Sequence, residues 1–211
     1  MRIIDFLDKH AHHAVMRELQ VPDVPEMLSA LGELLGSRGQ RYELVLIGGA
    51  SLQLRGVITR PTRDADVLAE WVDDRLVPMP NLPEDLRVAV RDVGEAYAAA
   101  TDWLNTGPQS LIELGLPSGF EARLERRDFD PGLVIWLAGR YDLVCFKLYA
   151  AADEWPSRGR HLQDLRALTP GPDDLRQAAR WARSHDPSPG FRERQLGPLL
   201  RELGVDDDVR D

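Results

Sequence analysis

The segment from residue 44 to residue 66 constrains the fold of this chain more than any other stretch of its sequence. It begins with the apolar run Leu44 to Ile47, which is typical of a strand buried on both faces. Two glycines follow, then an apolar stretch ending at Arg55 that we expect to be a short helix, and then a basic loop leading to Asp64-Ala65-Asp66. This order predicts a strand, a tight turn, a helix and a second strand.

The glycine pair, Gly48 and Gly49, suits the binding of an anion. Glycine has no Cβ atom, so the backbone can turn sharply and a ligand can approach it closely. The first N–H groups of a helix over residues 50–55 would point outward, and the helix dipole favours negative charge there. Ser51 adds a hydroxyl donor. The pair therefore predicts a phosphate-sized opening, with a plain tight turn as the alternative.

Asp64 and Asp66 are separated by one residue, and side chains at that spacing project from the same face of a strand. Two such carboxylates repel each other unless a cation lies between them. Mg²⁺, or Mn²⁺ in its place, fits, because Mg²⁺ is usually held by one or two carboxylates together with substrate phosphates. Such ions can activate an attacking hydroxyl and stabilise leaving pyrophosphate. The alternative is a solvent-facing pair that caps a loop.

Three arginines crowd the connection between the glycines and the carboxylates, namely Arg55, Arg60 and Arg63. Guanidinium groups bind phosphate oxygens through two parallel hydrogen bonds. We expect phosphate contact from this group, with Arg63 as the nucleotide-binding candidate. The alternative is ordinary salt bridging to the neighbouring carboxylates Asp64, Asp66 and Glu70.

The second half of the chain carries a lysine and an aspartate that face inward. Leu143, Lys147 and Ala150 lie on one face of a helix expected from Tyr141 onward. Asp164 has a similar place on the next helix. A buried ammonium is costly unless it is paired. The two residues therefore either form a structural pair or reach a shared active site.

These motifs resemble the nucleotidyltransferase superfamily, and among its members the bacterial AbiEii/MenT toxin-type enzymes and their uncharacterised relatives. The resemblance also rests on Trp103-Leu104-Asn105, on residues 143–150 and on residues 161–168, so that it touches roughly residues 42 to 170. It implies an α/β fold in which a small mixed sheet is flanked by helices and followed by a C-terminal helical bundle.

The resemblance also implies an activity. It is Mg²⁺-dependent transfer of a nucleoside monophosphate from a nucleoside triphosphate to a hydroxyl of RNA or protein, and transfer RNA is a known type of acceptor in the resembled group. It further implies a toxin with an antitoxin partner. The implied catalytic residues are Asp64, Asp66, Lys147 and Asp164, with Asp64 and Asp66 as metal ligands and Gly48, Gly49, Ser51 and Arg63 binding the nucleotide.

A third metal carboxylate, common in the superfamily, is not evident in the sequence. Its candidates are Glu121, Glu125, Asp128 and Asp130. The alternative function is therefore a nucleotide-binding or scaffold protein that keeps the fold and has little or no turnover.

Composition sets outer bounds on the chain. Its 211 residues, 43% of them hydrophobic, suffice for one core with a helical extension. We expect a core with N-terminal helices over residues 1–138, a helical region over 139–205 and an acidic tail over 206–211. The single cysteine excludes disulfides, and the chain has neither a signal-peptide pattern nor an apolar run of ~20 residues. We therefore expect a cytoplasmic protein with no membrane partner. The net charge of −9 gives no support of its own to RNA binding.

Periodicity and breakers predict the remaining elements. Helices are expected over residues 6–19, 24–35 and 84–100, strands over 120–126 and 133–137, and turns over 101–119. Everything after Gly139 is expected to be helical, with breaks at Pro156, at 170–172 and at 187–189. The three histidines at positions 10, 12 and 13 are expected to lie on a solvated face rather than to bind metal.

Overall fold

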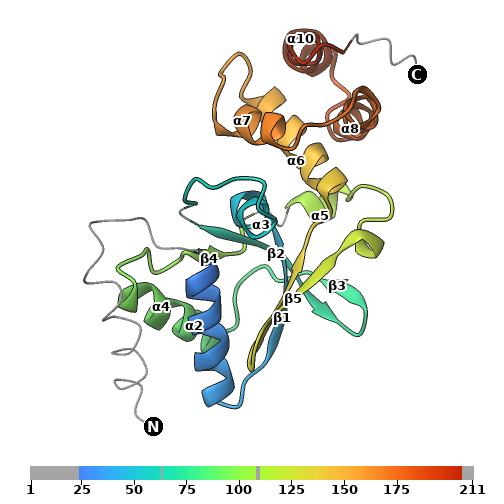
Figure 1. Ribbon diagram of the computed structural model, residues 1–211. Helices are drawn as coiled ribbons and strands as arrows, with labels where there is room; N and C mark the ends of the chain where they lie inside the picture. The colour runs from blue at the N-terminus through green and yellow to red at the C-terminus, as the bar shows by residue number, and fades with distance from the viewer. Residues whose placement is uncertain (1–23, 63, 108–109, 206–211) are drawn as a thin grey trace. The chain divides into compact units, whose positions relative to one another are not determined.

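The structure is a computed structural model that describes residues 24–62, 64–107 and 110–205. The chain divides into two compact units (Figure 1). The first unit contains the residues up to 113 together with 124–137, and the second contains 114–123 and the residues from 138 onward. The expected helix over residues 6–19, the three histidines and the acidic tail lie outside the described residues.

The first unit is built on a mixed sheet. Its elements are α2 (Val24–Ser37), β1 (Tyr42–Ile47), α3 (Gly48–Leu54), β2 (Ala65–Val72), β3 (Arg75–Val77), α4 (Glu84–Ala96), β4 (Leu104–Asn105), β5 (Glu125–Phe129) and β6 (Leu133–Leu137); the short helix α5 (Ser110–Leu114) follows β4. The strand order is β3-β2-β1-β6-β5, and β4 also pairs with β2. The β1–β6 and β2–β4 pairs are parallel and the others antiparallel. The predicted α/β fold with a small mixed sheet is confirmed.

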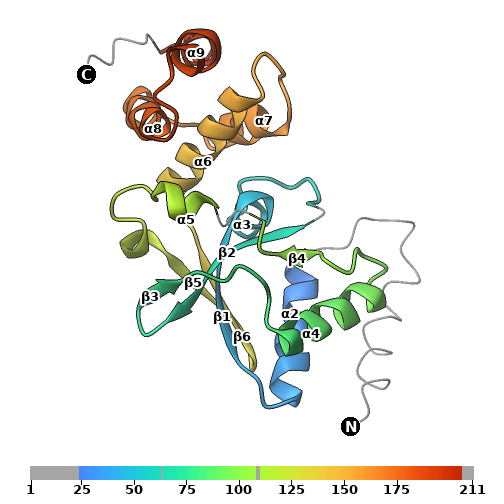
Figure 2. The ribbon, with the colours of Figure 1, turned by 180° about the vertical axis from the view of Figure 1, so that it is seen from behind.

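Helices α2 and α4 lie on one face of the sheet, as the two opposite views show (Figures 1 and 2). Helix α2 is amphipathic, and its leucines are almost fully buried. They pack in one core with alternate residues of β1 and β6, such as Leu44, Leu46 and Ile135. Burying one such side chain contributes about 1.5–3 kcal/mol. This core therefore fixes β1, and with it the position of the glycine turn that follows.

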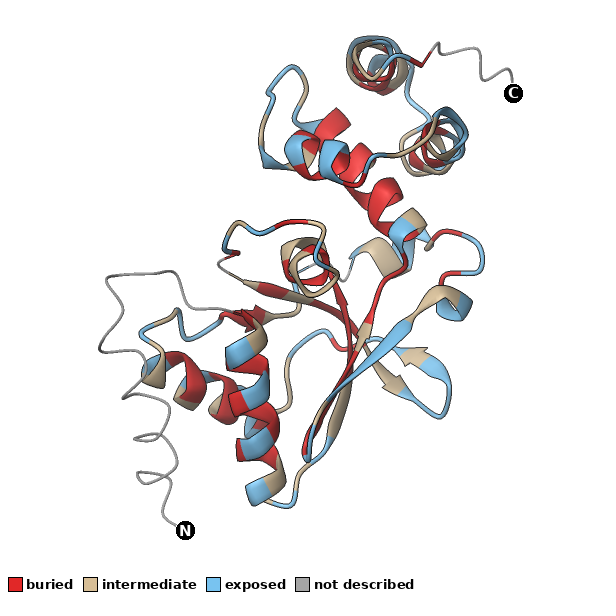
Figure 3. Ribbon diagram, in the orientation of Figure 1, coloured by how far each residue is buried: buried red, intermediate tan, exposed pale blue. Residues whose placement is uncertain are grey.

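Strand β5 begins later than expected. The strand predicted over residues 120–126 is wrong, because residues 121–123 form a turn of 3₁₀ helix (η1, Glu121–Arg123) and the strand runs from Glu125 to Phe129. Its bounds follow from the register with β6, in which Glu125 pairs with Leu137 and Phe129 with Leu133. Figure 3 shows β5 largely exposed, whereas its neighbour β6 is mostly buried. Such charged residues on an edge strand discourage further pairing.

The second unit is helical. It contains α6 (Arg140–Asp153), α7 (Arg160–Ala167), α8 (Pro172–His185), α9 (Pro189–Phe191), a π-helical turn η2 (Arg192–Leu196) and α10 (Gly197–Glu202). The breaks expected around Pro156, 170–172 and 187–189 are confirmed. Helix α6 is buried on most of its surface, which marks it as the central helix of this unit. No helix among the described residues combines the length and the apolar character needed to cross a membrane.

Cys145, the only cysteine of the chain, is fully buried in α6. Burial raises the pKa of its thiol to about 12, so thiolate is scarce even at mildly alkaline pH. We expect a thiol reagent such as DTNB to leave Cys145 unmodified in the native protein and to modify it completely in concentrated guanidinium chloride. Rapid reaction of the native protein would contradict the burial of this side chain.

Candidate active site

Asp66 and Gly48 meet where β1 ends and α3 begins. In the β1–β2 ladder, Ile47 lies opposite Asp66, so the next residue, Gly48, reaches the carboxylate. Gly48 has a φ of +74°, and a Cβ atom at this position would overlap the Asp66 carboxylate. Glycine is therefore required here both for the backbone conformation and for the close approach.

Asp64 lies just before β2, and both aspartates are half-buried on either side of the fully buried Ala65. Because β2 begins at Ala65, the expectation that the two carboxylates share one face of a strand stays a prediction. The preceding loop is held by Thr62, whose buried Oγ1 donates to the Asp64 carbonyl oxygen at 3.1 Å. A Cβ atom at Gly49 would come within 2.7 Å of the same Oγ1. The loop and the glycine turn are therefore packed directly against each other.

Ser51 follows in the first turn of α3. It is fully buried, and its Oγ has no hydrogen-bond partner within the described part of the chain. A buried hydroxyl without a partner costs about 1–3 kcal/mol and calls for water or a ligand as its missing partner.

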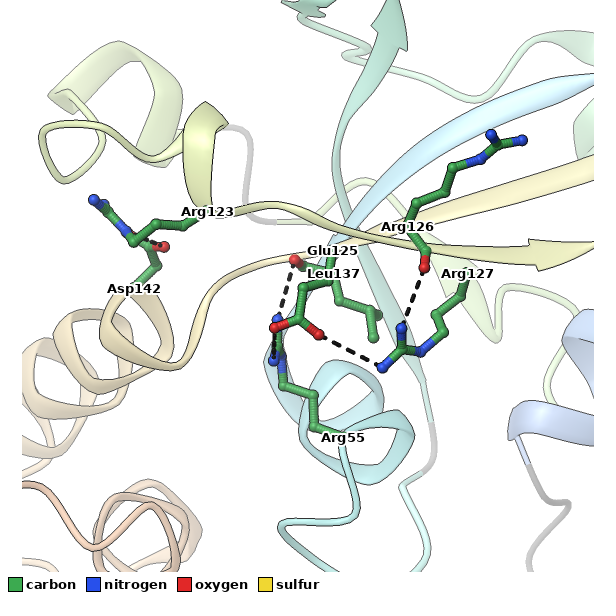
Figure 4. Close-up of polar contacts among 7 residues, drawn as sticks. All are labelled: Arg55, Arg123, Glu125, Arg126, Arg127, Leu137 and Asp142. Carbon is green, nitrogen blue, oxygen red and sulfur yellow. Dashed lines mark hydrogen bonds and ion pairs between the residues drawn. The ribbon is translucent and has the colours of Figure 1, made fainter.

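The arginines near these carboxylates have different surroundings. Arg55 forms an ion pair with Glu125 of β5 at 2.8 Å and donates to the Leu137 carbonyl oxygen at 3.4 Å (Figure 4). The salt-bridge alternative therefore applies to Arg55, although its partner is not one of the three carboxylates expected. Arg60 is half-buried in the loop, and Arg63 lies outside the described residues.

The sheet order excludes two candidates for the third metal carboxylate. Glu125 and Asp128 lie on β5, which is three strands away from β2, or about 14 Å at the usual spacing between strands. Glu125 pairs with Arg55 and Arg127, and Asp128 pairs with Arg126. Asp130 follows the far end of β5, and Glu121 belongs to the second unit. Within the described ranges, no group of three or more His, Cys, Asp and Glu residues could hold a metal ion.

An amide, Asn105, stands beside Asp66 instead. In the parallel β2–β4 pair, Asp66 and Asn105 are direct partners, so their side chains emerge on the same face. Asn105 Oδ1 accepts a hydrogen bond from the Gly107 N–H at 2.9 Å. The sequence indicated Asn105 only through the resemblance of Trp103-Leu104-Asn105, because a strand of two residues has no periodicity that would reveal its pairing.

The donor atoms at this edge of the sheet fit a Mg²⁺ ion that the substrate completes. Asp64 and Asp66 offer carboxylate oxygens two positions apart in the sequence, and the Asp66 carboxylate lies where a Cβ atom of residue 48 would be. Mg²⁺ commonly keeps waters and binds one or two carboxylates together with substrate phosphates. A site with two carboxylates is sufficient for that arrangement, whereas a cage built from protein ligands alone would need more.

In the second unit, Lys147 of α6 and Asp164 of α7 form a buried ion pair. The distance from Lys147 Nζ to Asp164 Oδ2 is 2.8 Å, and the side chains are 7% and 1% exposed. Both residues face inward, as the helical spacing predicts. The sequence left open a structural ion pair or a shared active site, and the structure contains the ion pair. His161 lies nearby, and burial together with the Lys147 charge lowers its pKa. The pair therefore links α6 to α7, whatever further role either residue has.

A second buried carboxylate anchors the segment that precedes β5. Asp142 is fully buried, and Arg123 donates to its two oxygens at 2.6 and 3.0 Å (Figure 4). Burial raises the pKa of Asp142, and the Arg123 guanidinium opposes that rise. This bidentate pair ties residues 114–123 to α6 within the second unit.

Replacement of Gly48 by alanine tests the close approach to Asp66. We expect Gly48→Ala to lose about 1–2 kcal/mol of stability from the positive φ and, in addition, to displace the Asp66 carboxylate. Gly39→Ala is the matched control, because Gly39 has a φ of +69° with nothing within 4 Å of the added Cβ. Thermal melts and nucleotide binding should show both variants destabilised and only Gly48→Ala impaired in binding. Equal binding by the two variants would contradict the proposed contact.

Residues 26–156 match the model of a family described as a nucleotidyltransferase of unknown function, DUF6036. The matched range contains most of α2, the glycine turn, Asp64, Asp66, Asn105 and Lys147, and it ends before Asp164. No curated protein matches the chain.

Proposed function

Because the chain belongs to this family of nucleotidyltransferases of unknown function, we propose that it transfers a nucleoside monophosphate from a nucleoside triphosphate to a hydroxyl group. Nucleotidyltransferases generally use divalent metal ions, and Mg²⁺ is the proposed ion here, with Mn²⁺ as a substitute. The acceptor oxygen would bond to the α-phosphorus while the bond from that phosphorus to the bridging oxygen breaks and pyrophosphate leaves.

The observation that carries this proposal is the contact between Asp66 and the turn that begins α3. The Asp66 carboxylate lies directly against Gly48, and Asp64 precedes it by two residues. Phosphate oxygens bound at this turn and a cation bound by the aspartates would be neighbours. This arrangement supports a site that brings together a triphosphate and a metal ion.

The proposal gives each of these residues a role. Backbone N–H groups at Gly48 and Gly49 would hold phosphate oxygens, together with the hydroxyl of Ser51 and the guanidinium of Arg63. Asp64 and Asp66 would hold the metal ion, which supplies charge stabilisation and activates the attacking hydroxyl when it is bound. The resemblance adds Lys147 as a contact of the phosphates and Asp164 as the residue that orients Lys147 or assists the acceptor.

The resemblance to AbiEii/MenT toxins supports a more specific proposal for the acceptor and for the biological role. We propose that the acceptor is RNA, for example transfer RNA, rather than protein. We also propose that the protein is a toxin with an antitoxin as its partner. Growth of an expression strain tests the toxin role. The wild-type chain should arrest growth and an Asp66→Ala variant should not. Normal growth of the wild-type strain in the absence of a partner protein would contradict it.

A second candidate function is supported by Asn105. The position beside Asp66 holds an amide, and an amide is a weaker metal ligand and cannot act as a base. This favours a nucleotide-binding protein with little or no turnover as the alternative.

Label transfer distinguishes these two functions. The protein is incubated with Mg²⁺, total RNA and each α-³²P-labelled nucleoside triphosphate in turn, and label is followed into RNA and into the protein itself. Label in either acceptor, dependent on Asp66, is the expected result. Nucleotide binding detected by thermal shift without any label transfer would favour the alternative, and neither binding nor transfer would overturn both.

A further inference from the structure

Asn105 of β4 stands next to the proposed metal site, on the side opposite the glycine turn. Strand β4 lies beside the start of β2, and Asn105 is the direct partner of Asp66 in that parallel pair (Figure 2). On its other side, Asp66 is the partner of Ile47, the residue that precedes Gly48. Direct partners on neighbouring strands are about 4.8 Å apart and project from the same face. The Asp66 carboxylate therefore lies between the glycine turn and the Asn105 amide.

The orientation of the Asn105 amide is fixed by the Gly107 backbone. The Gly107 nitrogen lies 2.9 Å from Asn105 Oδ1. A backbone N–H can only donate, so the atom that faces it has to be the amide oxygen, and the two donors on Nδ2 project away from Gly107. Within the described ranges, Nδ2 forms no hydrogen bond. Asn105 is half-buried, so these donors are partly withdrawn from water and remain available to a ligand.

Asn105 is thus a donor at a position where a metal ligand would have to be an acceptor. An ionised carboxylate binds a cation through its oxygens and has no hydrogen to donate. The Asn105 oxygen already accepts a hydrogen bond, and the groups that remain without a partner are N–H groups. Such groups bind anions, and beside the carboxylates Asp64 and Asp66 the anion that needs donors is the phosphate chain of the substrate.

The donors on the two sides of Asp66 are unequal. The glycine turn offers the backbone N–H groups of Gly48 and Gly49 together with the Ser51 hydroxyl, which is buried and has no partner in the described part of the chain. Asn105 offers a single amide. The two terminal phosphates of a triphosphate carry most of its negative charge, so the side with more donors suits them. The phosphate next to the nucleoside then falls on the Asn105 side of Asp66.

We propose that Asn105 donates a hydrogen bond from Nδ2 to a non-bridging oxygen of the α-phosphate, the group that is transferred. This inference rests on the proposed function and adds a substrate contact to it. Donors whose orientation is fixed before the reaction stabilise charge on such oxygens with little reorganisation. Asn105 keeps its protons throughout, so it binds and orients the phosphate without a part in proton transfer. Gly107 is the residue that positions it.

Two substitutions of Asn105 separate a phosphate donor from a metal ligand. Asn105→Ala removes the donors. Asn105→Asp keeps the shape and replaces the donors by a carboxylate, which repels phosphate but would strengthen a metal site. Asn81→Ala and Asn81→Asp are the matched controls, because Asn81 is exposed in the segment between β3 and α4. Thermal melts establish that each variant is folded.

Isothermal titration calorimetry in the presence of Mg²⁺ measures the binding of two probes, pyrophosphate and each nucleoside triphosphate in turn. We expect Asn105→Ala to weaken triphosphate binding about tenfold, because a hydrogen bond to a charged group is lost. Asn105→Asp should weaken it further through repulsion. Pyrophosphate has no α-phosphate, so its binding should be unchanged in both variants. The Asn81 variants should bind both probes like the wild type.

Three results would overturn the inference. Wild-type affinity for the triphosphate in Asn105→Ala would show that the contact does not exist. Tighter triphosphate binding or faster transfer by Asn105→Asp would identify the position as a metal ligand instead of a donor. Equal weakening of pyrophosphate and triphosphate binding would remove the contact from the α-phosphate.

Label transfer by the same proteins separates this inference from the proposed function. Triphosphate binding that depends on Asn105, without label transfer from any triphosphate, would overturn the transferase and leave the contact standing. Label transfer by Asn105→Ala at the wild-type rate and with wild-type affinity would overturn the contact and leave the transferase standing. Absence of triphosphate binding by the wild-type protein would overturn both.

Discussion

Asp66→Ala is expected to abolish nucleotidyl transfer while the protein remains folded. Removal of this carboxylate takes away one of the two proposed metal ligands and the group that faces the glycine turn. Loss of a single preorganised electrostatic contact commonly costs about 10²–10³ in rate, and loss of a metal ligand should cost at least as much. The rate of label transfer at saturating nucleotide and metal measures the effect. Asp66→Asn should be similarly inactive, since an amide keeps the shape and lacks the charge.

Asp128→Ala is the matched control for Asp66→Ala. Asp128 is an exposed aspartate on β5 of the same sheet, three strands from β2, and its ion pair with Arg126 lies on the surface. We expect this variant to retain wild-type transfer. If Asp66→Ala retained transfer within a factor of a few of the control, the assignment of the metal site to this edge of the sheet would be wrong.

Lys147→Met is expected to lower the free energy of unfolding by about 3–5 kcal/mol. The substitution leaves the Asp164 carboxylate buried without the ammonium that compensates its charge, and such half-removed pairs are strongly destabilising. The double variant Lys147→Met/Asp164→Leu should recover much of this loss, because an apolar pair of similar volume carries no buried charge. Urea unfolding of the three proteins gives the coupling between the two sites.

Activity of the double variant separates a structural role of the pair from a functional one. If Lys147 contacts phosphate, as the resemblance implies, the double variant should be stable and inactive. Recovery of both stability and activity would restrict the pair to packing of α6 against α7. Arg158→Met is the surface control, because Arg158 pairs with Glu202 at 2.7 Å but is 66% exposed. We expect that control to leave the free energy of unfolding almost unchanged.

The sequence allowed prediction of the glycine turn and the inward-facing pair, because both depend on local rules. A buried strand ending in glycines can be recognised from its residues alone, and so can two carboxylates separated by one position. The spacing of Lys147 along α6 likewise defines the face on which it lies. The structure confirms β1 and the start of β2, the short helix between them and the burial of Lys147 and Asp164.

The features that escaped prediction depend on pairing between distant parts of the chain. Nothing local to Glu125 indicates that β5 lies three strands from β2, so Glu125 remained a candidate for the metal site until the sheet order was known. The same holds for Arg55, whose partner is 70 residues away in the sequence. Asn105 is the clearest case, since its position beside Asp66 comes from a parallel pair of two residues on each strand. Register of this kind is determined by tertiary packing and not by the composition of the strand.

The path of the chain determines which fragments of this protein can be produced. Residues 114–123 belong to the helical unit, although they precede two strands of the sheet unit. Trp181 Nε1 donates to the Gly115 carbonyl oxygen, Phe120 packs near Phe146, and Arg123 holds the buried Asp142. A fragment that ends after β6 therefore carries this segment without the helices against which it packs.

The complementary fragment, from residue 138 onward, retains a buried aspartate without its arginine. The first truncation exposes apolar surface to water, and the second leaves a buried carboxylate without a compensating charge. Both changes favour aggregation or proteolysis. The two units are interleaved in the sequence, so neither can be excised by a single cut. A stable fragment of this protein has to be made by shortening its ends, and a tag or a fusion partner belongs at a terminus rather than at the junction of the units.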